Sequence, residues 1–134
     1  MVRYNILVID DDRRTAMFTA DMLRLDGHIV AVAFGARSAL HQLSEIIPDV
    51  VFVDMNMPSV DGLEICRYLR RDPLTARLPI IVISANAEDG YKKAAAAAGA
   101  NDYIVKPAMI EDLNRVLEKC VAGSLGLNAT QLAP

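Results

Sequence analysis

Residues 6–12 read Ile-Leu-Val-Ile-Asp-Asp-Asp, a short apolar run that ends abruptly in three acids. Four more runs rich in valine and isoleucine follow along the chain. Because none of the runs alternates apolar with polar residues, they are typical of strands buried on both faces of a parallel sheet. The sequence therefore predicts five strands, at Ile6–Ile9, Ile29–Phe34, Val50–Val53, Leu78–Ile83 and Tyr103–Val105.

Segments with helical spacing separate the predicted strands. Gly27 and Gly99 suit the ends of the first and fourth helices, and Asp61-Gly62 suits the start of the third. The alternation of strand and helix predicts a doubly wound α/β domain. The fourth helix is an alanine-rich stretch at 92–98, and the apolar faces of the others consist of Thr15, Phe18, Met22 and Leu25; Ala36, Leu40, Leu43 and Ile47; Leu63, Cys66 and Leu69; and Leu113, Val116 and Cys120.

The composition indicates one globular domain. The chain has 134 residues, of which 53% are hydrophobic and 23% charged, and this suffices for a core without a disulfide or metal. The net charge of −3 supplies no broad basic surface, so direct nucleic-acid binding is not expected. The first apolar run is too short for a signal peptide or a membrane span, which predicts a cytoplasmic protein with reduced Cys66 and Cys120. His28 and His41 are predicted at the surface or in turns.

Polar side chains follow four of the predicted strands. Asp10-Asp11-Asp12 follow the first strand, Asp54 the third, Ser84 the fourth and Lys106 the fifth. Ligands of open parallel sheets bind beyond the carboxyl ends of the strands, so these side chains are predicted to share one edge. Asp10, Asp11 and Asp54 would repel one another there without a cation, and Mg²⁺ is the ion that such carboxylates favour. The alternative, that an acid only caps the following helix, stays open for Asp12.

Asp54 is the candidate nucleophile of this edge. A carboxylate can attack phosphorus and form an acyl phosphate when cations neutralise the incoming oxygens, and Lys106 and Mg²⁺ could supply that charge. Ser84 could add a hydroxyl ligand for a phosphoryl oxygen. The alternatives are a solvated lysine and an ordinary turn serine. Glycine-rich nucleotide-binding loops are absent from the sequence.

Together these residues resemble the receiver domains of two-component response regulators. The resemblance covers roughly Asn5–Cys120 and implies the fold of the chemotaxis regulators, a three-layer, doubly wound (βα)5 flavodoxin-like domain with a five-stranded parallel sheet in the order 2-1-3-4-5. A receiver domain at 1–121 and a C-terminal tail or linker stub at 122–134 are expected. The motifs are Ile6-Leu-Val-Ile-Asp-Asp-Asp12, Val53-Asp-Met-Asn-Met-Pro-x-x-Asp-Gly62, Ile83-Ser-Ala85 and Ala98-Gly-Ala-x-Asp-Tyr-Ile-x-Lys-Pro107.

The resemblance implies that Asp54 accepts a phosphoryl group from a histidine of a sensor kinase or a histidine phosphotransfer protein. Asp10, Asp11, Asp54 and the backbone carbonyl of Asn56 would hold Mg²⁺, for which Mn²⁺ can substitute. Two positions tune the phosphate lifetime in such domains, and they are occupied here by Asn56 and Asn86. Neither side chain is charged, so the sequence assigns no lifetime.

The same resemblance implies a switch. Ser84 and Lys106 would hold the phosphoryl oxygens, and Tyr103 would follow Ser84 inward. That movement would remodel the surface formed by the fourth helix, fifth strand and fifth helix, a shift between two populated states. The Lys106-Pro107 peptide is expected to be cis, an isomer that is accessible before proline.

The leading interpretation is a phosphorylation-switched module of bacterial type that controls a partner protein or an attached output domain. Pairing with a second copy through the same surface is consistent with the resemblance. One alternative is a constitutive interaction module, or pseudo-receiver. Another is a haloacid-dehalogenase-like phosphatase, whose usual second acid is replaced here by Asn56. Turnover of the acyl phosphate would be self-catalysed, so the chain is not expected to be an enzyme.

Overall fold

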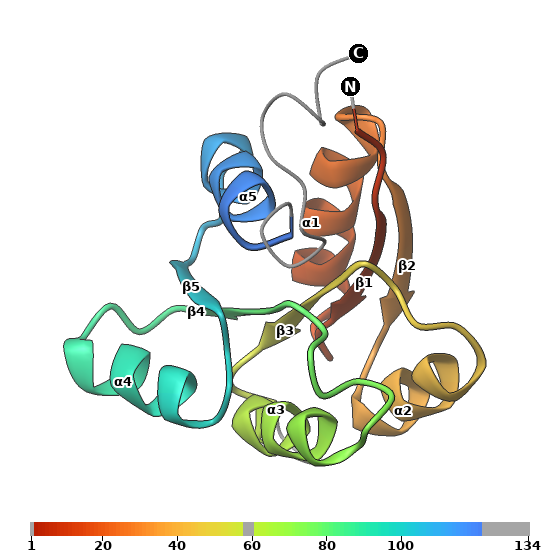
Figure 1. Ribbon diagram of the computed structural model, residues 1–134. Coiled ribbons are helices and arrows are strands. Elements are labelled where there is room, and N and C mark those ends of the chain that lie inside the picture. Colours follow the sequence, from red (N-terminus) through yellow and green to blue (C-terminus); the bar gives the residue numbers. More distant parts are fainter. Residues whose placement is uncertain (1, 58–60, 122–134) are drawn as a thin grey trace.

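The computed structural model, shown in Figure 1, describes residues 2–57 and 61–121. The expected tail at 122–134 lies outside the described residues, as does Pro58 of the second motif, so the domain boundary at 121 stays a prediction. The elements are β1 (Asn5–Ile9), α1 (Arg13–Leu25), β2 (Ile29–Ala33), α2 (Ala36–Glu45), β3 (Val50–Asp54), α3 (Gly62–Arg71), β4 (Ile80–Ser84), α4 (Asp89–Ala97), β5 (Asp102–Val105), α5 (Ile110–Val116) and a final π-helical turn, η1 (Leu117–Val121).

The strands form one parallel sheet in the order β2-β1-β3-β4-β5, which confirms the predicted fold. Helices α1 and α5 cover one face, and α2, α3 and α4 cover the other (Figure 1). All residues of β3 and β4 are buried, as their unbroken apolar runs predicted. Within the described part of the chain, no helix is long and apolar enough to cross a membrane.

The predicted apolar face of the first helix is wrong. Phe18 is 54% exposed and Leu25 is 89% exposed. The face on the sheet consists of small residues and one leucine: Ala16, Thr19, Ala20 and Leu23. Both sets recur every three or four positions, so spacing alone could not separate them. Small side chains let the helix backbone pack close to the sheet, and close packing of the core decides the orientation.

Smaller differences concern the second and fifth helices. Leu43 faces the core as predicted, but Ala39 is the other buried residue of α2 and Ile47 lies beyond its end. Leu113 and Val116 are buried in α5, whereas Cys120 lies in η1 and is only partly buried. The predicted face of the third helix, by contrast, is fully buried.

The surface prediction for His28 is also wrong. His28 is 8% exposed, and its Nδ1 accepts a hydrogen bond of 3.1 Å from the backbone N–H of Tyr4. The two rings stack with centroids 5.4 Å apart. A residue 24 positions away therefore supplies the partner that allows this histidine to be buried, and no local pattern indicates it.

Candidate functional site

The carboxyl ends of four strands deliver the predicted site residues to one edge of the sheet. Asp10 follows β1, Asp54 ends β3, Ser84 ends β4 and Lys106 follows β5. The Nζ atom of Lys106 lies 2.6 Å from Oδ1 of Asp54 and 3.7 Å from Oδ2 of Asp10. One carboxylate oxygen from each of Asp10, Asp11 and Asp54 lies within 4.8 Å of the other two. Residues that are far apart in the sequence thus form a single cluster of charge.

Backbone groups fix the position of Asp10. Its own N–H donates to the carbonyl of Ala33 at 3.1 Å, and its Oδ1 accepts from the N–H of Asp12 at 2.9 Å. The side chain of Asp12 turns to the helix instead, where it accepts from the N–H groups of Arg14 and Thr15 and caps α1. The capping alternative therefore holds for Asp12, while Asp10 faces the cluster.

Asp54 is held by its strand. It is paired in register with Ile83 of β4, and the N–H of Met55 donates to the carbonyl of Ile83 at 3.0 Å. Its side chain is 6% exposed. Asn56 lies two residues further on, exposed, and its backbone forms an isolated bridge with Asp61. The expected metal-binding role of the Asn56 carbonyl stays a prediction.

Burial makes the carboxylates costly to ionise. Burial raises the pKa of Asp10 to about 6, and the charges of Asp54 and Asp11 add to this, while the Asp12 N–H and Lys106 oppose it. Burial likewise raises the pKa of Asp54, against the hydrogen bond and charge of Lys106. For Lys106, burial works against the charge, but Asp54 and Asp10 outweigh it and raise its pKa. The lysine is thus a firmly held cation in an acidic site.

The charge balance of the cluster fits a divalent cation. Three ionised carboxylates and one ammonium leave two negative charges within a few ångströms. Oxygen ligands of this type are those that Mg²⁺ and Mn²⁺ prefer. The donor set therefore fits the metal that the sequence predicted.

Ser84 and Tyr103 meet at one backbone position of the loop after β4. Ser84 is fully buried, and its Oγ accepts from the N–H of Asn86 at 3.1 Å. The hydroxyl of Tyr103 donates to the carbonyl of Asn86 at 2.7 Å and lies 3.8 Å from Sδ of Met55. The two predicted switch residues are therefore linked through Asn86, which the sequence had marked only as a lifetime position.

An open hollow of about 460 Å³ adjoins the cluster. Arg14, Phe18, Lys106 and Pro107 are among the residues that line it, and the Lys106-Pro107 peptide is cis. The exposed Phe18 of α1 thus belongs to the rim of the site rather than to the core. Sequence reasoning placed it in the core because a large aromatic residue at helical spacing is usually buried.

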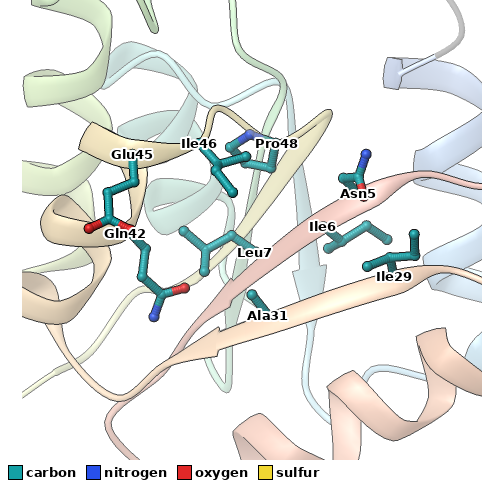
Figure 2. A pocket seen from close by; sticks show the side chains of 9 residues that line it. All are labelled: Asn5, Ile6, Leu7, Ile29, Ala31, Gln42, Glu45, Ile46 and Pro48. Atoms are coloured by element: carbon teal, nitrogen blue, oxygen red, sulfur yellow. The ribbon is translucent and has the colours of Figure 1, made fainter.

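A second groove, of about 240 Å³, lies at the opposite end of the sheet. Figure 2 shows Leu7 of β1 next to Ile46 and Pro48, and Ile29 of β2 lines the same groove near Asn5. Ile29 is the first residue of β2, whereas the carboxylates lie at or just after the last residues of their strands. This groove is therefore separate from the charged cluster.

Comparisons with known proteins agree with this geometry. Residues 6–118 match the family model of the response regulator receiver domain. The phosphate regulon transcriptional regulatory protein PhoB of Rhizobium meliloti is 35% identical over 108 residues, which are 81% of this chain and 48% of that protein. The chain spans about half the length of such curated relatives, since it also covers 46% of the response regulator MprA of Mycolicibacterium vanbaalenii.

Solved structures of the same kind superpose closely. A putative response regulator from Chloroflexus aurantiacus is 33% identical with a TM-score of 0.85, covering 90% of this chain and 99% of that one. The receiver domain of sensor histidine kinase PA1611 from Pseudomonas aeruginosa, with magnesium in its active-site cleft, is 28% identical with a TM-score of 0.82 and the same two coverages. The chain belongs to the family of response regulator receiver domains of two-component systems.

Proposed function

We propose that Asp54 accepts a phosphoryl group from a phosphorylated histidine of a kinase or phosphotransfer protein. The observation that supports this most is the buried Asp54 carboxylate, whose Oδ1 lies 2.6 Å from Lys106 Nζ beside two further carboxylates. The carboxylate oxygen would attack phosphorus while the bond from phosphorus to the histidine nitrogen breaks. The product is an acyl phosphate on Asp54 and a free imidazole.

Mg²⁺ would be held by Asp10, Asp11, Asp54 and the carbonyl of Asn56. When bound, the ion would neutralise negative charge on the carboxylates and on the incoming phosphoryl oxygens. Lys106 would supply the fixed positive charge on the other side of Asp54, because its Nζ already contacts that carboxylate. The raised pKa of Lys106 keeps it protonated throughout the neutral range.

The acyl phosphate would change the loop after β4. Ser84 Oγ can donate its proton to a phosphoryl oxygen, and Tyr103 is coupled to the same loop through the carbonyl of Asn86. A movement of Ser84 would therefore change the position of Tyr103 and the shape of the surface formed by α4, β5 and α5. A partner protein, an output domain or a second copy of the chain would read that surface.

The hollow between α1 and the segment after β5 is a suitable approach for the phosphodonor. Its rim carries the exposed Phe18 and Pro107 next to Lys106. The donor protein would bury this apolar rim and bring its phosphohistidine to Asp54. The same site would also hydrolyse its own acyl phosphate. Because this turnover is self-catalysed and acts on no separate substrate, we do not propose that the chain is an enzyme.

Intact mass after incubation with acetyl phosphate and Mg²⁺ tests the proposal. The wild type should gain one phosphoryl group, and Asp54→Asn or an excess of chelator should abolish the gain. Asp12→Asn is the matched control, because asparagine also caps a helix and Asp12 faces α1 rather than the cluster. This variant should be phosphorylated like the wild type.

Two outcomes would count against the proposal. If neither acetyl phosphate nor a phosphohistidine protein labelled the wild type, the constitutive interaction module would replace it. If Asp54→Asn were labelled as well as the wild type, the acceptor would be another residue.

A further inference from the structure

Gly62, the first residue of α3, lies directly against the backbone of the proposed acceptor. A Cβ atom at Gly62 would lie 2.1 Å from the carbonyl oxygen of Asp54 and 3.0 Å from both its carbonyl carbon and the Cα of Met55. These distances are shorter than van der Waals contact, and all three atoms belong to the backbone. The carbonyl of Asp54 thus occupies the space that any side chain at Gly62 would need.

Hydrogen bonds on both sides keep the Asp54 backbone in this place. On the sheet side, the N–H of Met55 donates to the carbonyl of Ile83 at 3.0 Å. On the helix side, the N–H of Gly62 donates to the carbonyl of Met55 at 2.9 Å. The end of β3 is therefore clamped between β4 and the first turn of α3, and it cannot yield to a side chain without losing one of these contacts.

The start of α3 is itself anchored. The side chain of Asp61 accepts from the N–H of Leu63 at 2.9 Å and caps the helix, while its backbone pairs with Asn56. The helix cannot simply retreat, because Leu63 is buried in the core formed with α2 and α4. A side chain at Gly62 would thus be accommodated mainly by displacing Asp54 or the helix start.

We propose that Gly62 is a positioning residue for phosphoryl transfer, which sets the depth of the Asp54 carboxylate relative to Lys106 and Asp10. This inference rests on the proposed function of Asp54. The carboxylate is joined to the clamped backbone through one methylene, so a shift of the backbone changes the 2.6 Å contact with Lys106 Nζ. Misplacement of reacting groups by about 1 Å costs up to about 100-fold in rate.

Gly62→Ala tests this inference, with two controls. Gly90→Ala adds a methyl group in α4 at a site with nothing within 4 Å. Asp61→Ala removes the cap of the same helix but adds no atom against Asp54. Three measurements are made on each purified full-length chain: backbone NMR shifts, Mg²⁺ affinity by calorimetry, and the rate of phosphorylation by acetyl phosphate.

Gly62→Ala should shift the amide resonances of Met55 and Asn56, and lower both the Mg²⁺ affinity and the phosphorylation rate by roughly tenfold or more. Gly90→Ala should match the wild type in all three. Asp61→Ala should lose thermal stability yet keep the Mg²⁺ affinity, which separates misplacement of Asp54 from a general weakening of α3.

Wild-type Mg²⁺ affinity in a folded Gly62→Ala would overturn the inference. Failure of this variant to fold, even with trimethylamine N-oxide, would also overturn it, because the glycine would then serve the whole fold. A wild type that takes up no phosphoryl group would instead refute the proposed function. In that case the NMR shifts and the Mg²⁺ affinity would still decide whether Gly62 positions Asp54.

Discussion

The two ends of the sheet differ in how their polar groups are paired. At the carboxyl ends, three acids lie close together, two of them pair with Lys106, and burial raises the pKa of Asp10 to about 6. At the amino ends, polar groups are matched one by one. The guanidinium of Arg70 donates to the carbonyls of Leu78 at 2.6 Å and Gly99 at 2.9 Å, and also to Oδ1 of Asn101 at 2.8 Å.

This difference separates stability from function. The same Asn101 oxygen accepts from the N–H of Ile80 at 2.8 Å. Arg70 therefore links α3 by hydrogen bonds to the segments that precede β4 and β5. Such a network stabilises the fold because each of these partly buried groups has a hydrogen-bond partner. The acidic end instead retains repulsion that a bound cation would relieve. One end of the domain thus stabilises the fold, and the other is arranged for a ligand.

Removal of Arg70 should have the largest effect on stability. Arg70→Ala removes this donor from several partly buried carbonyl groups, and the free energy of unfolding should fall by about 3 kcal/mol in urea titrations followed by circular dichroism. Arg67→Ala on the same helix is the control, since exposed ion pairs such as Arg67 with Glu64 contribute less than about 1 kcal/mol. Equal losses in the two variants would contradict the assigned role of Arg70.

The acidic end should make the metal-free protein more stable as the pH falls. The folded pKa of Asp10, about 6, lies above its ordinary value of 3.8, so the folded state takes up a proton first. Between pH 7 and pH 5, with chelator present, this proton uptake should add about 1.3 kcal/mol to the free energy of unfolding. Asp10→Asn should remove that gain, and a wild-type pH profile in Asp10→Asn would contradict the assignment.

Magnesium should stabilise the fold through the same end. At a concentration about tenfold above its dissociation constant, Mg²⁺ should add about 1.4 kcal/mol to the free energy of unfolding at pH 7. Asp10→Asn should show a smaller gain at the same concentration, and Arg70→Ala the full gain, because Arg70 lies at the other end of the sheet. Equal gains in wild type and Asp10→Asn would place the ion elsewhere.

The smallest effect on stability is expected at His28, and its pH dependence should be opposite in sign to that of Asp10. Burial lowers the pKa of His28, while Asp26 works against this shift. The neutral ring accepts the Tyr4 N–H, so its contribution is complete above about pH 6.5 and is lost as the pH falls through the lower folded pKa. His28→Asn retains an acceptor that does not titrate. Relative to this variant, the wild type should lose stability on acidification; parallel profiles would refute the role.

Much of the site could be predicted because its signals are local in the sequence. Each functional side chain follows the apolar run of its own strand, and parallel strands bring their carboxyl ends to one edge. The grouping at one edge could therefore be predicted without knowing how the helices pack, for Asp10, Asp54, Ser84 and Lys106. The turn signals at Gly27, Asp61-Gly62 and Gly99 are local in the same sense, and the helix ends agree with them.

The sequence by itself determined the alternating strands and helices and the acids, hydroxyl and lysine at the strand ends, because burial period and turn chemistry depend on neighbouring residues. Only the tertiary structure decided which face of α1 meets the sheet, the burial of His28, the hydrogen bonds of Arg70 and the contact of Gly62 with Asp54. Each of these depends on which atoms arrive from distant parts of the chain. Close packing and the pairing of buried polar groups select among faces that the local pattern leaves equivalent.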